Sequence, residues 1–83
     1  MNKQAEVRIQ TTPKMADIII RSLTPELNRT SFRAEVGLDR TPGGDQLVLV
    51  VKAQDVNALR AALNSYLRWI KCIMEIDREL IDE

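Results

Sequence analysis

Residues 46–53 read QLVLVVKA, and this stretch decides the fold because it is apolar on both faces. In an extended chain its apolar side chains divide between the two faces, with Leu47, Leu49 and Val51 on one and Val48 and Val50 on the other. Strands of this kind usually lie in the middle of a sheet with both faces covered. We therefore predict that 46–53 is a central strand.

Two other stretches alternate between apolar and polar residues, as half-buried strands do. One is AEVRIQ at 5–10, and the other is FRAEVGL at 32–38. In the second, Phe32, Ala34, Val36 and Leu38 are predicted to point inward, and Arg33, Glu35 and Gly37 outward. The loop DRTPGGD at 39–45 is rich in turn residues, so 32–38 and 46–53 form a hairpin.

Two helices are predicted from their start signals and their periodicity. Thr12 and Pro13 suit a helix start, and the apolar residues Ala16, Ile19, Ile20 and Leu23 follow at helical spacing. Pro25 should end or kink this helix at Thr24, with TPEL at 24–27 adding one turn that Thr24 can cap. Asp55 is a good cap for a long second helix, since no Pro or Gly follows it.

The element order is therefore β-α-β-β-α in a single domain, 1–83. A right-handed crossover leaves a gap between the first two strands, which lie parallel, and the third strand fits that gap antiparallel to both. We predict an α+β fold, with a three-stranded antiparallel sheet of order 1-3-2 and both helices on one face.

Small size predicts an additional source of stability. A chain of 83 residues buries only about 60% of its unfolded surface and is marginal alone. Cys72 is the only cysteine and there is no histidine, so an internal disulfide and a Cys/His metal site are excluded. Oligomerisation or a protein partner remains. Because no apolar run reaches transmembrane length and the first residues lack a signal-peptide core, we expect a cytoplasmic protein with no membrane contact.

The long helix has more apolar surface than one contact can cover. At 100° per residue its apolar arc spans about 240°, whereas a surface helix needs about 100°. The bulky side of the arc is assigned to the sheet: Leu59, Leu63, Tyr66, Leu67 and Ile70. The other side has small residues, which let another helix approach, and Trp69 as an anchor. Met15 and Ile18 of the first helix also point away from its core stripe. The predicted partner-binding residues are Ile18, Ala58, Ala61, Ser65, Trp69, Cys72 and Ile76. The alternative is that the first helix covers this side entirely.

The opposite face of the sheet would expose Val48 and Val50 beside Arg8, Arg33, Glu35 and Lys52. These valines could face solvent in a monomer, but a second sheet or chain explains them better. We predict that a second sheet or another chain covers Val48 and Val50.

Catalytic chemistry has no candidate residues in the chain. There is no histidine for general base work, Cys72 has no activating neighbour, and no phosphate-loop pattern exists. We predict no catalytic, cofactor-binding or metal-binding residues, and no enzyme.

The net charge is zero, yet residues 1–72 are basic and 73–83 acidic. This asymmetry fits a solvated helix end or a weak nucleic-acid contact. A stand-alone KH-like RNA-binding module is the alternative function, although a GxxG clamp and a stacking aromatic pair are missing.

Two segments carry a resemblance to a known family. SLTPEL at 22–27 and LVLVVKAQDVNALRAALNSYLRWI at 47–70 resemble the small subunit of the KEOPS complex, the CTAG/Pcc family, in its archaeal form. The run from Ala53 to Arg68 is the more specific of the two.

The resemblance implies a non-catalytic scaffold. KEOPS forms threonylcarbamoyladenosine beside the anticodon of tRNAs that read codons beginning with A. The family's small subunit homodimerises and holds the catalytic threonylcarbamoyltransferase through packed helices. The resemblance therefore implies a homodimer, this transferase as partner, and tRNA as an indirect or weak contact. The homodimer could pair through strand edges or through sheet faces, and Val48 and Val50 favour the faces. Candidate tRNA contacts on the basic body are Arg8, Arg33, Arg60 and Arg68.

Overall fold

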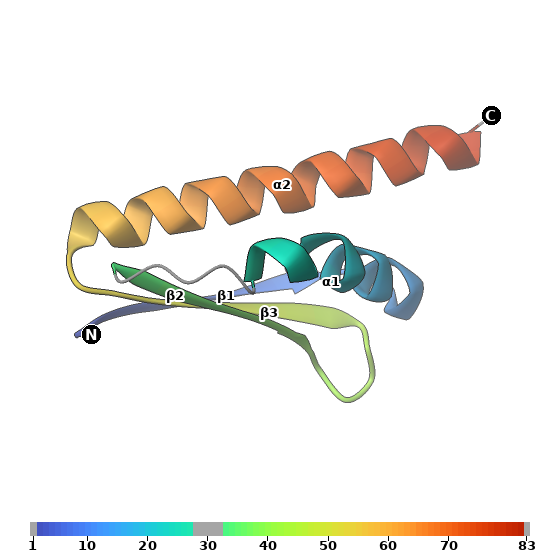
Figure 1. Ribbon diagram of the computed structural model, residues 1–83. Coiled ribbons are helices and arrows are strands. Elements are labelled where there is room, and N and C mark those ends of the chain that lie inside the picture. The colour runs from blue at the N-terminus through green and yellow to red at the C-terminus, as the bar shows by residue number, and fades with distance from the viewer. Residues whose placement is uncertain (1, 28–32, 83) are drawn as a thin grey trace.

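The computed structural model describes residues 2–27 and 33–82, with side chains up to residue 75. The elements follow in the order β1 (Lys3–Gln10), α1 (Pro13–Leu27), β2 (Ala34–Arg40), β3 (Gln46–Ala53) and α2 (Val56–Asp82). Figure 1 shows the sheet as one layer and the two helices as a second layer on one of its faces. The predicted α+β fold is confirmed.

The sheet has the strand order β1-β3-β2, and both outer strands are antiparallel to β3. β3 has the predicted bounds. β1 begins two residues before the alternating stretch, and β2 extends to Arg40 because its pairing with β3 continues to Leu47. The prediction for Phe32 falls outside the described residues.

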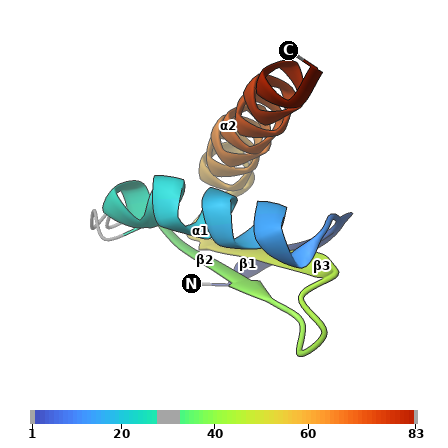
Figure 2. The same ribbon diagram turned by 90° about the vertical axis from the view of Figure 1, so that its right-hand side faces the viewer.

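The core lies between the helices and the inner face of the sheet. Leu47, Leu49 and Val51 are fully buried there, as predicted. Helical residues cover them, namely Ala16, Ile19 and Leu23 from α1 and Tyr66 and Ile70 from α2. Seen along α2, the two helices cross above the sheet (Figure 2), so α1 covers only part of α2. None of the described helices is long and apolar enough to cross a membrane.

Both helix starts have the predicted caps. The hydroxyl of Thr12 accepts a hydrogen bond from the backbone N–H of Met15 at 3.2 Å. Asp55 accepts one from the N–H of Ala58 at 2.8 Å. These bonds satisfy N–H groups that have no partner within the helix.

The turn predicted at 24–27 is present, but it is continuous with α1 and is not capped separately by Thr24. α1 continues through Pro25 to Leu27 as one helix. Proline so close to a helix end removes only one backbone hydrogen bond. The hydroxyl of Thr24 donates to the carbonyl of Ile20 at 2.6 Å instead of capping a new turn.

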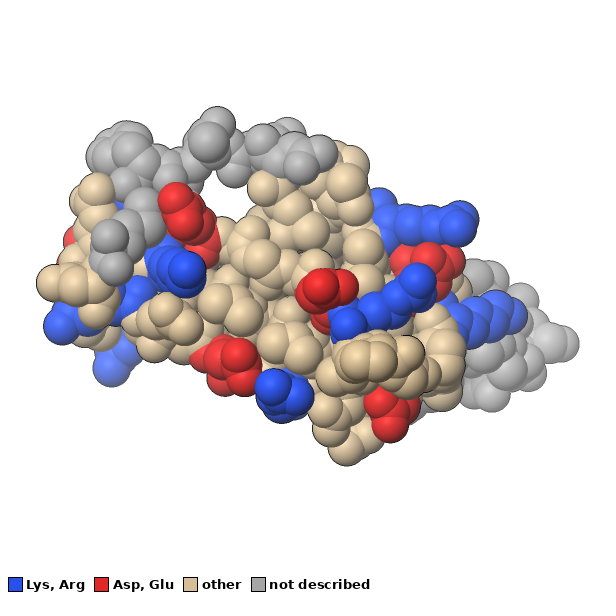
Figure 3. Space-filling view, turned by 90° about the horizontal axis from the view of Figure 1, so that it is seen from below, with Lys and Arg blue, Asp and Glu red and all other residues tan. Residues whose placement is uncertain are grey.

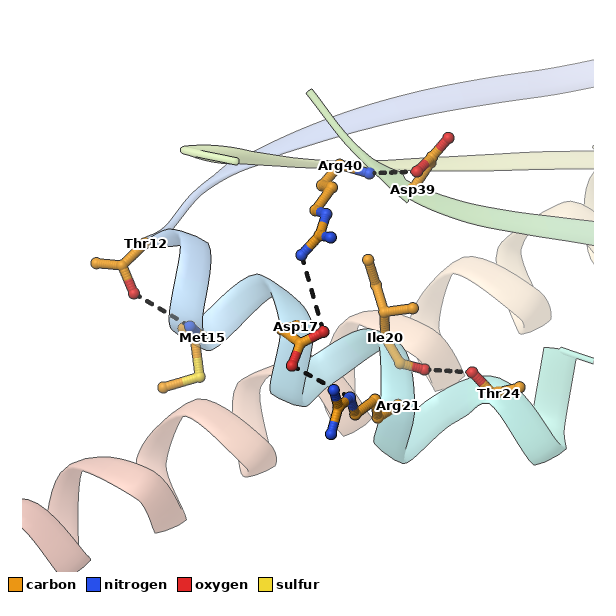
Figure 4. A network of polar contacts seen from close by, with 8 residues as sticks. All are labelled: Thr12, Met15, Asp17, Ile20, Arg21, Thr24, Asp39 and Arg40. Atoms are coloured by element: carbon orange, nitrogen blue, oxygen red, sulfur yellow. Dashed lines mark hydrogen bonds and ion pairs between the residues drawn. The ribbon is translucent and has the colours of Figure 1, made fainter. Parts of the chain in front are cut away.

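Asp17 joins α1 to the end of β2. Its carboxylate lies 3.1 Å from Arg21 on the next turn and 3.8 Å from Arg40 at the end of β2 (Figure 4). All three side chains are exposed or half-buried, so each pair adds at most about 1 kcal/mol. These contacts link α1 to the end of β2 but add little stability.

Candidate protein-interaction surfaces

α2 divides between a buried side and an open side, as its periodicity predicts. On the buried side, Tyr66 and Ile70 are in the core, and Leu59, Leu63 and Leu67 pack against it. On the open side, Ala61, Ser65, Trp69 and Cys72 are exposed and Ala58 is half-buried. Within the described residues, α1 does not cover this side.

A groove of about 380 Å³ lies beside this open side of α2. The end of α1 and the start of β2 form its other walls. Among the described residues, the groove is lined by Glu26, Leu27, Arg33, Ala34, Val36, Ala58, Ala61, Ala62, Ser65, Tyr66 and Trp69. Most of these are apolar or small, and the two charged residues come from the α1 and β2 walls.

An aromatic pair lies in the α2 wall of the groove. The rings of Tyr66 and Trp69 meet edge to face, with centroids 5.1 Å apart and planes at 68°. Tyr66 is buried, whereas Trp69 stays 37% exposed. The buried ring therefore holds the exposed one in place at the surface, which is the arrangement of a preorganised anchor.

The structure brings together four of the seven predicted partner-binding residues. Ala58, Ala61, Ser65 and Trp69 line the groove, whereas Ile18 and Cys72 do not. Ile18 is half-buried on α1 and Cys72 is exposed on α2. The side chain of Ile76 lies outside the described part of the chain. Met15 packs partly against the core, so the prediction that it points away from the core is wrong.

Sequence reasoning missed the floor and the far wall of the groove. Ala62 and Tyr66 belong to α2, and their spacing from Ala58 by four and eight residues could have placed them on the same side of the helix. Glu26, Leu27 and Ala34 come from other elements, and only the tertiary fold brings them to the groove.

The outer face of the sheet forms a second surface. The strand register places its residues in rows across the strands: Gln4, Lys52 and Glu35; Glu6, Val50 and Gly37; Arg8, Val48 and Asp39. Both valines are half-buried, so the centre of the face is apolar. Figure 3 shows uncharged atoms through the middle of this face and charges of both signs around them.

The four candidate tRNA arginines do not form one patch. Arg8, on the outer face, is 3.2 Å from Glu6. Arg33 was predicted on that face, but its guanidinium lies at the groove, 2.9 Å from Asp55. The reason is that β2 begins only at Ala34, so Arg33 does not follow the alternation of the strand. Arg60 and Arg68 are exposed on α2, two helical turns apart.

Asp55 is a described group whose acidity changes on folding. The N–H of Ala58 and then the Arg33 guanidinium hold the pKa of its carboxyl below the ordinary value of 3.8. The N–H of Ala58 is within reach because Asp55 caps the start of α2, whereas Arg33 comes from the entry to β2. No group of three potential metal-ligating side chains occurs among the described residues.

The fold and these surfaces define a class: a small α+β protein with an apolar groove and an open sheet face suited to protein contacts. The Pcc1 family model, described as "Transcription factor Pcc1", matches residues 4–76. The chain belongs to this family, and the resemblance inferred from its two segments is confirmed.

A curated relative is the KEOPS complex subunit Pcc1 of Pyrococcus abyssi (strain GE5 / Orsay). It is 39% identical over 49 residues, which are 59% of this chain and 50% of that protein. The match thus spans about half the length of the relative.

Proposed function

We propose that this protein is a non-catalytic scaffold subunit of a KEOPS complex. In this function it homodimerises, and each copy holds one catalytic threonylcarbamoyltransferase subunit. The complex forms threonylcarbamoyladenosine next to the anticodon of tRNAs that read codons beginning with A, in the cytoplasm. Family membership and the name of the Pyrococcus relative support the complex.

The open groove beside α2 is the observation that carries the partner proposal. Ala58, Ala61 and Ser65 give its α2 wall a low profile, so the backbone of a partner helix can come close. Trp69, at 37% exposed, offers a large aromatic surface for the partner to bury. Interfaces depend mostly on a few such anchors, and tryptophan is enriched among them. Glu26 and Arg33 supply polar groups on the opposite walls. The transferase is proposed to seat a helix here.

A charge placed in the groove tests this assignment. Ala61→Arg puts a long cation on an exposed helical position, so α2 should keep its stability while the groove is obstructed. Asn64→Arg is the matched control, because Asn64 is exposed on the polar side of the same helix and does not line the groove. We expect Ala61→Arg to weaken the complex with the transferase at least about tenfold in titration calorimetry, with Asn64→Arg near wild type. Equal affinities for both variants would remove the groove from the interface.

Dimerisation is proposed to use the outer face of the sheet, centred on Val48 and Val50. A domain of this size is marginally stable alone, and such a contact would bury more of its apolar surface. Light scattering of the purified chain, with and without the transferase, measures both associations. A monomer that ignores the transferase and binds RNA by itself would overturn the scaffold in favour of a KH-like module.

A further inference from the structure

β2 is an edge strand of the sheet. It pairs with β3 on one side, and no described strand lies on its other side. At one end of β2 the carbonyl of Arg33 accepts the N–H of Gln54, and at the other the N–H of Thr41 donates to Gln46. Because the bonding direction alternates along an antiparallel strand, the odd-numbered residues of β2 bond to β3. The even-numbered residues direct their N–H and C=O groups to the free edge.

The backbone groups at this edge are available to another strand. The N–H of Arg40 confirms their direction, because it is accepted by the side chain of Asp39 at 2.8 Å and not by β3. Ala34, Val36 and Leu38 make no such contact in the described part of the chain. Proline and β-bulges are two devices that protect edge strands, and β2 has neither, since its pairing with β3 is continuous. The edge can therefore accept an extended segment.

Two depressions flank the edge, one on each face of the sheet. On the inner face, Ala34 and Val36 line the groove beside α2. On the outer face there is a hollow of about 260 Å³, lined by Glu35, Val36, Gly37, Val50 and Lys52. Val36 lines both depressions, so they meet the edge at the same residue. Because successive side chains of a strand point to opposite faces, a strand added here would place them alternately in the groove and in the hollow.

Gly37 leaves room for a large side chain of the added strand. Its φ angle is not positive, and a Cβ atom on it would meet nothing within 4 Å, so the chain itself does not require glycine here. Since Val36 and Leu38 would bond to an added antiparallel strand, Gly37 would face it in a non-hydrogen-bonded pair, where side chains lie closest. An aromatic residue can cover a glycine across two strands, and here its ring would also meet Val50.

The charges around Gly37 favour basic residues on the added strand. Glu35 and Asp39 lie two positions to either side of Gly37, on the same face. One oxygen of Asp39 accepts the N–H of Arg40, and Lys52 is the register partner of Glu35. Neither carboxylate has an ion pair within 4 Å among the described residues. Opposite charges across two strands stabilise their pairing, so cations two positions before and after the aromatic residue fit this edge.

A second copy of the chain does not supply such a strand. None of the described strands contains an aromatic residue, so any of them would leave the hollow above Gly37 unfilled. We propose that the β2 edge binds an extended segment of a different protein, with an aromatic residue over Gly37, apolar neighbours against Val36 and basic residues two positions to either side. This goes beyond the proposed scaffold function, because the backbone edge belongs neither to the α2 wall assigned to the transferase nor to the sheet face assigned to the dimer.

A synthetic peptide tests the site. The seven-residue peptide TKVYVKT matches the length of β2 and reads the same in both directions, so its tyrosine can reach Gly37 whichever way it runs. At about 1 mM, a concentration suited to weak binding, it should shift the amide NMR signals of Ala34, Val36 and Leu38 in the full chain and slow their hydrogen exchange. The peptide TKVGVKT lacks the aromatic ring and should bind at least about tenfold more weakly.

Filling the hollow is the second test. Gly37→Val puts a β-branched side chain into free space, so thermal stability should be kept while the affinity for TKVYVKT falls at least about tenfold. Glu6→Val is the matched control, because Glu6 lies in the same row on the other side of Val50. Its affinity should stay within about twofold of wild type. The proposal would be overturned by shifts confined to β1, by equal binding of the two peptides, by full binding to Gly37→Val, or by no shift at β2.

Discussion

The guanidinium of Arg33 lies 2.9 Å from one carboxylate oxygen of Asp55, and the other oxygen accepts the N–H of Ala58 at 2.8 Å. The entry to β2 is thus tied to the first turn of α2. Arg33 and Ala58 both line the groove, so this pair of contacts also fixes the distance between two of its walls. Asp55 therefore supports the fold and the proposed partner surface together.

We predict a pH-dependent role for Asp55. Its pKa is lowered in the folded state, so its contribution to stability is present above the unfolded pKa of about 3.9 and is lost as the pH falls through the folded value. Asp55→Ala should be less stable than wild type at pH 7, and the difference should shrink below about pH 4. Asp55→Asn is the control, because asparagine caps helices without a charge. Urea titrations at both pH values measure this. A constant difference between wild type and Asp55→Ala would show that the charge is irrelevant.

Trp69→Ala should weaken binding of the transferase by about 2–4 kcal/mol if Trp69 is a central anchor. The same substitution should lower the stability of the unbound monomer less, because the side chain is 37% exposed and its main described ring contact is with Tyr66. Val56→Ala is the matched control, since Val56 is 47% exposed on the same helix and lies outside the groove. Calorimetric titration gives the affinity, and thermal melting verifies the fold. Equal effects of the two substitutions would move Trp69 to the rim of the interface.

The arginines on α2 should contribute more to any tRNA contact than the paired ones. Arg8 and Arg33 are each within 3.2 Å of a carboxylate, which partly neutralises them. Arg60 and Arg68 have no ion pair among the described residues and share one exposed stripe. Changing both to Gln should lower the tRNA affinity of the assembled complex and reduce its salt slope by about one per lost phosphate contact. Arg8→Gln should have a smaller effect. An unchanged slope in the double variant would exclude direct phosphate contacts by these arginines.

The sequence predicted the elements whose signals are local. The apolar run at 46–53 identified β3, and Thr12 and Asp55 marked the two helix starts, because capping depends on residues within one turn. The division of α2 into a buried side and an open side was also predicted correctly, because helical geometry alone decides which residues share a side.

Features that depend on tertiary contacts escaped prediction. Pro25 predicts a helix end or kink at Thr24 followed by one further turn, but α1 runs through it as one helix, because proline in the last turn costs little. Arg33 was assigned to the outer face by alternation, yet Asp55, 22 residues away, draws its side chain to the groove. Glu26 and Leu27 reach the groove only because α1 crosses the sheet toward the start of β2. No spacing rule connects such residues before the fold is known.

The two glycines of the PGG turn should differ sharply when replaced. The sequence predicts a turn at this point, but only the structure shows that Gly44 has a φ of +74°. A Cβ atom on Gly44 would also lie 3.1 Å from the Cβ of Pro13, the first residue of α1. At Gly43 a Cβ atom would meet only the side chain of Asp45, at ordinary distances.

We therefore predict that Gly44→Ala destabilises the protein by more than about 1 kcal/mol, because strain in the left-handed region adds to the contact with Pro13. Gly43→Ala should stay within about 0.5 kcal/mol of wild type. For a domain of this size, 1 kcal/mol corresponds to a shift in Tm of about 4–8 °C, which thermal melting resolves. If both variants melt together with wild type, the turn must be able to adopt another conformation, and α1 would not depend on its packing against Gly44.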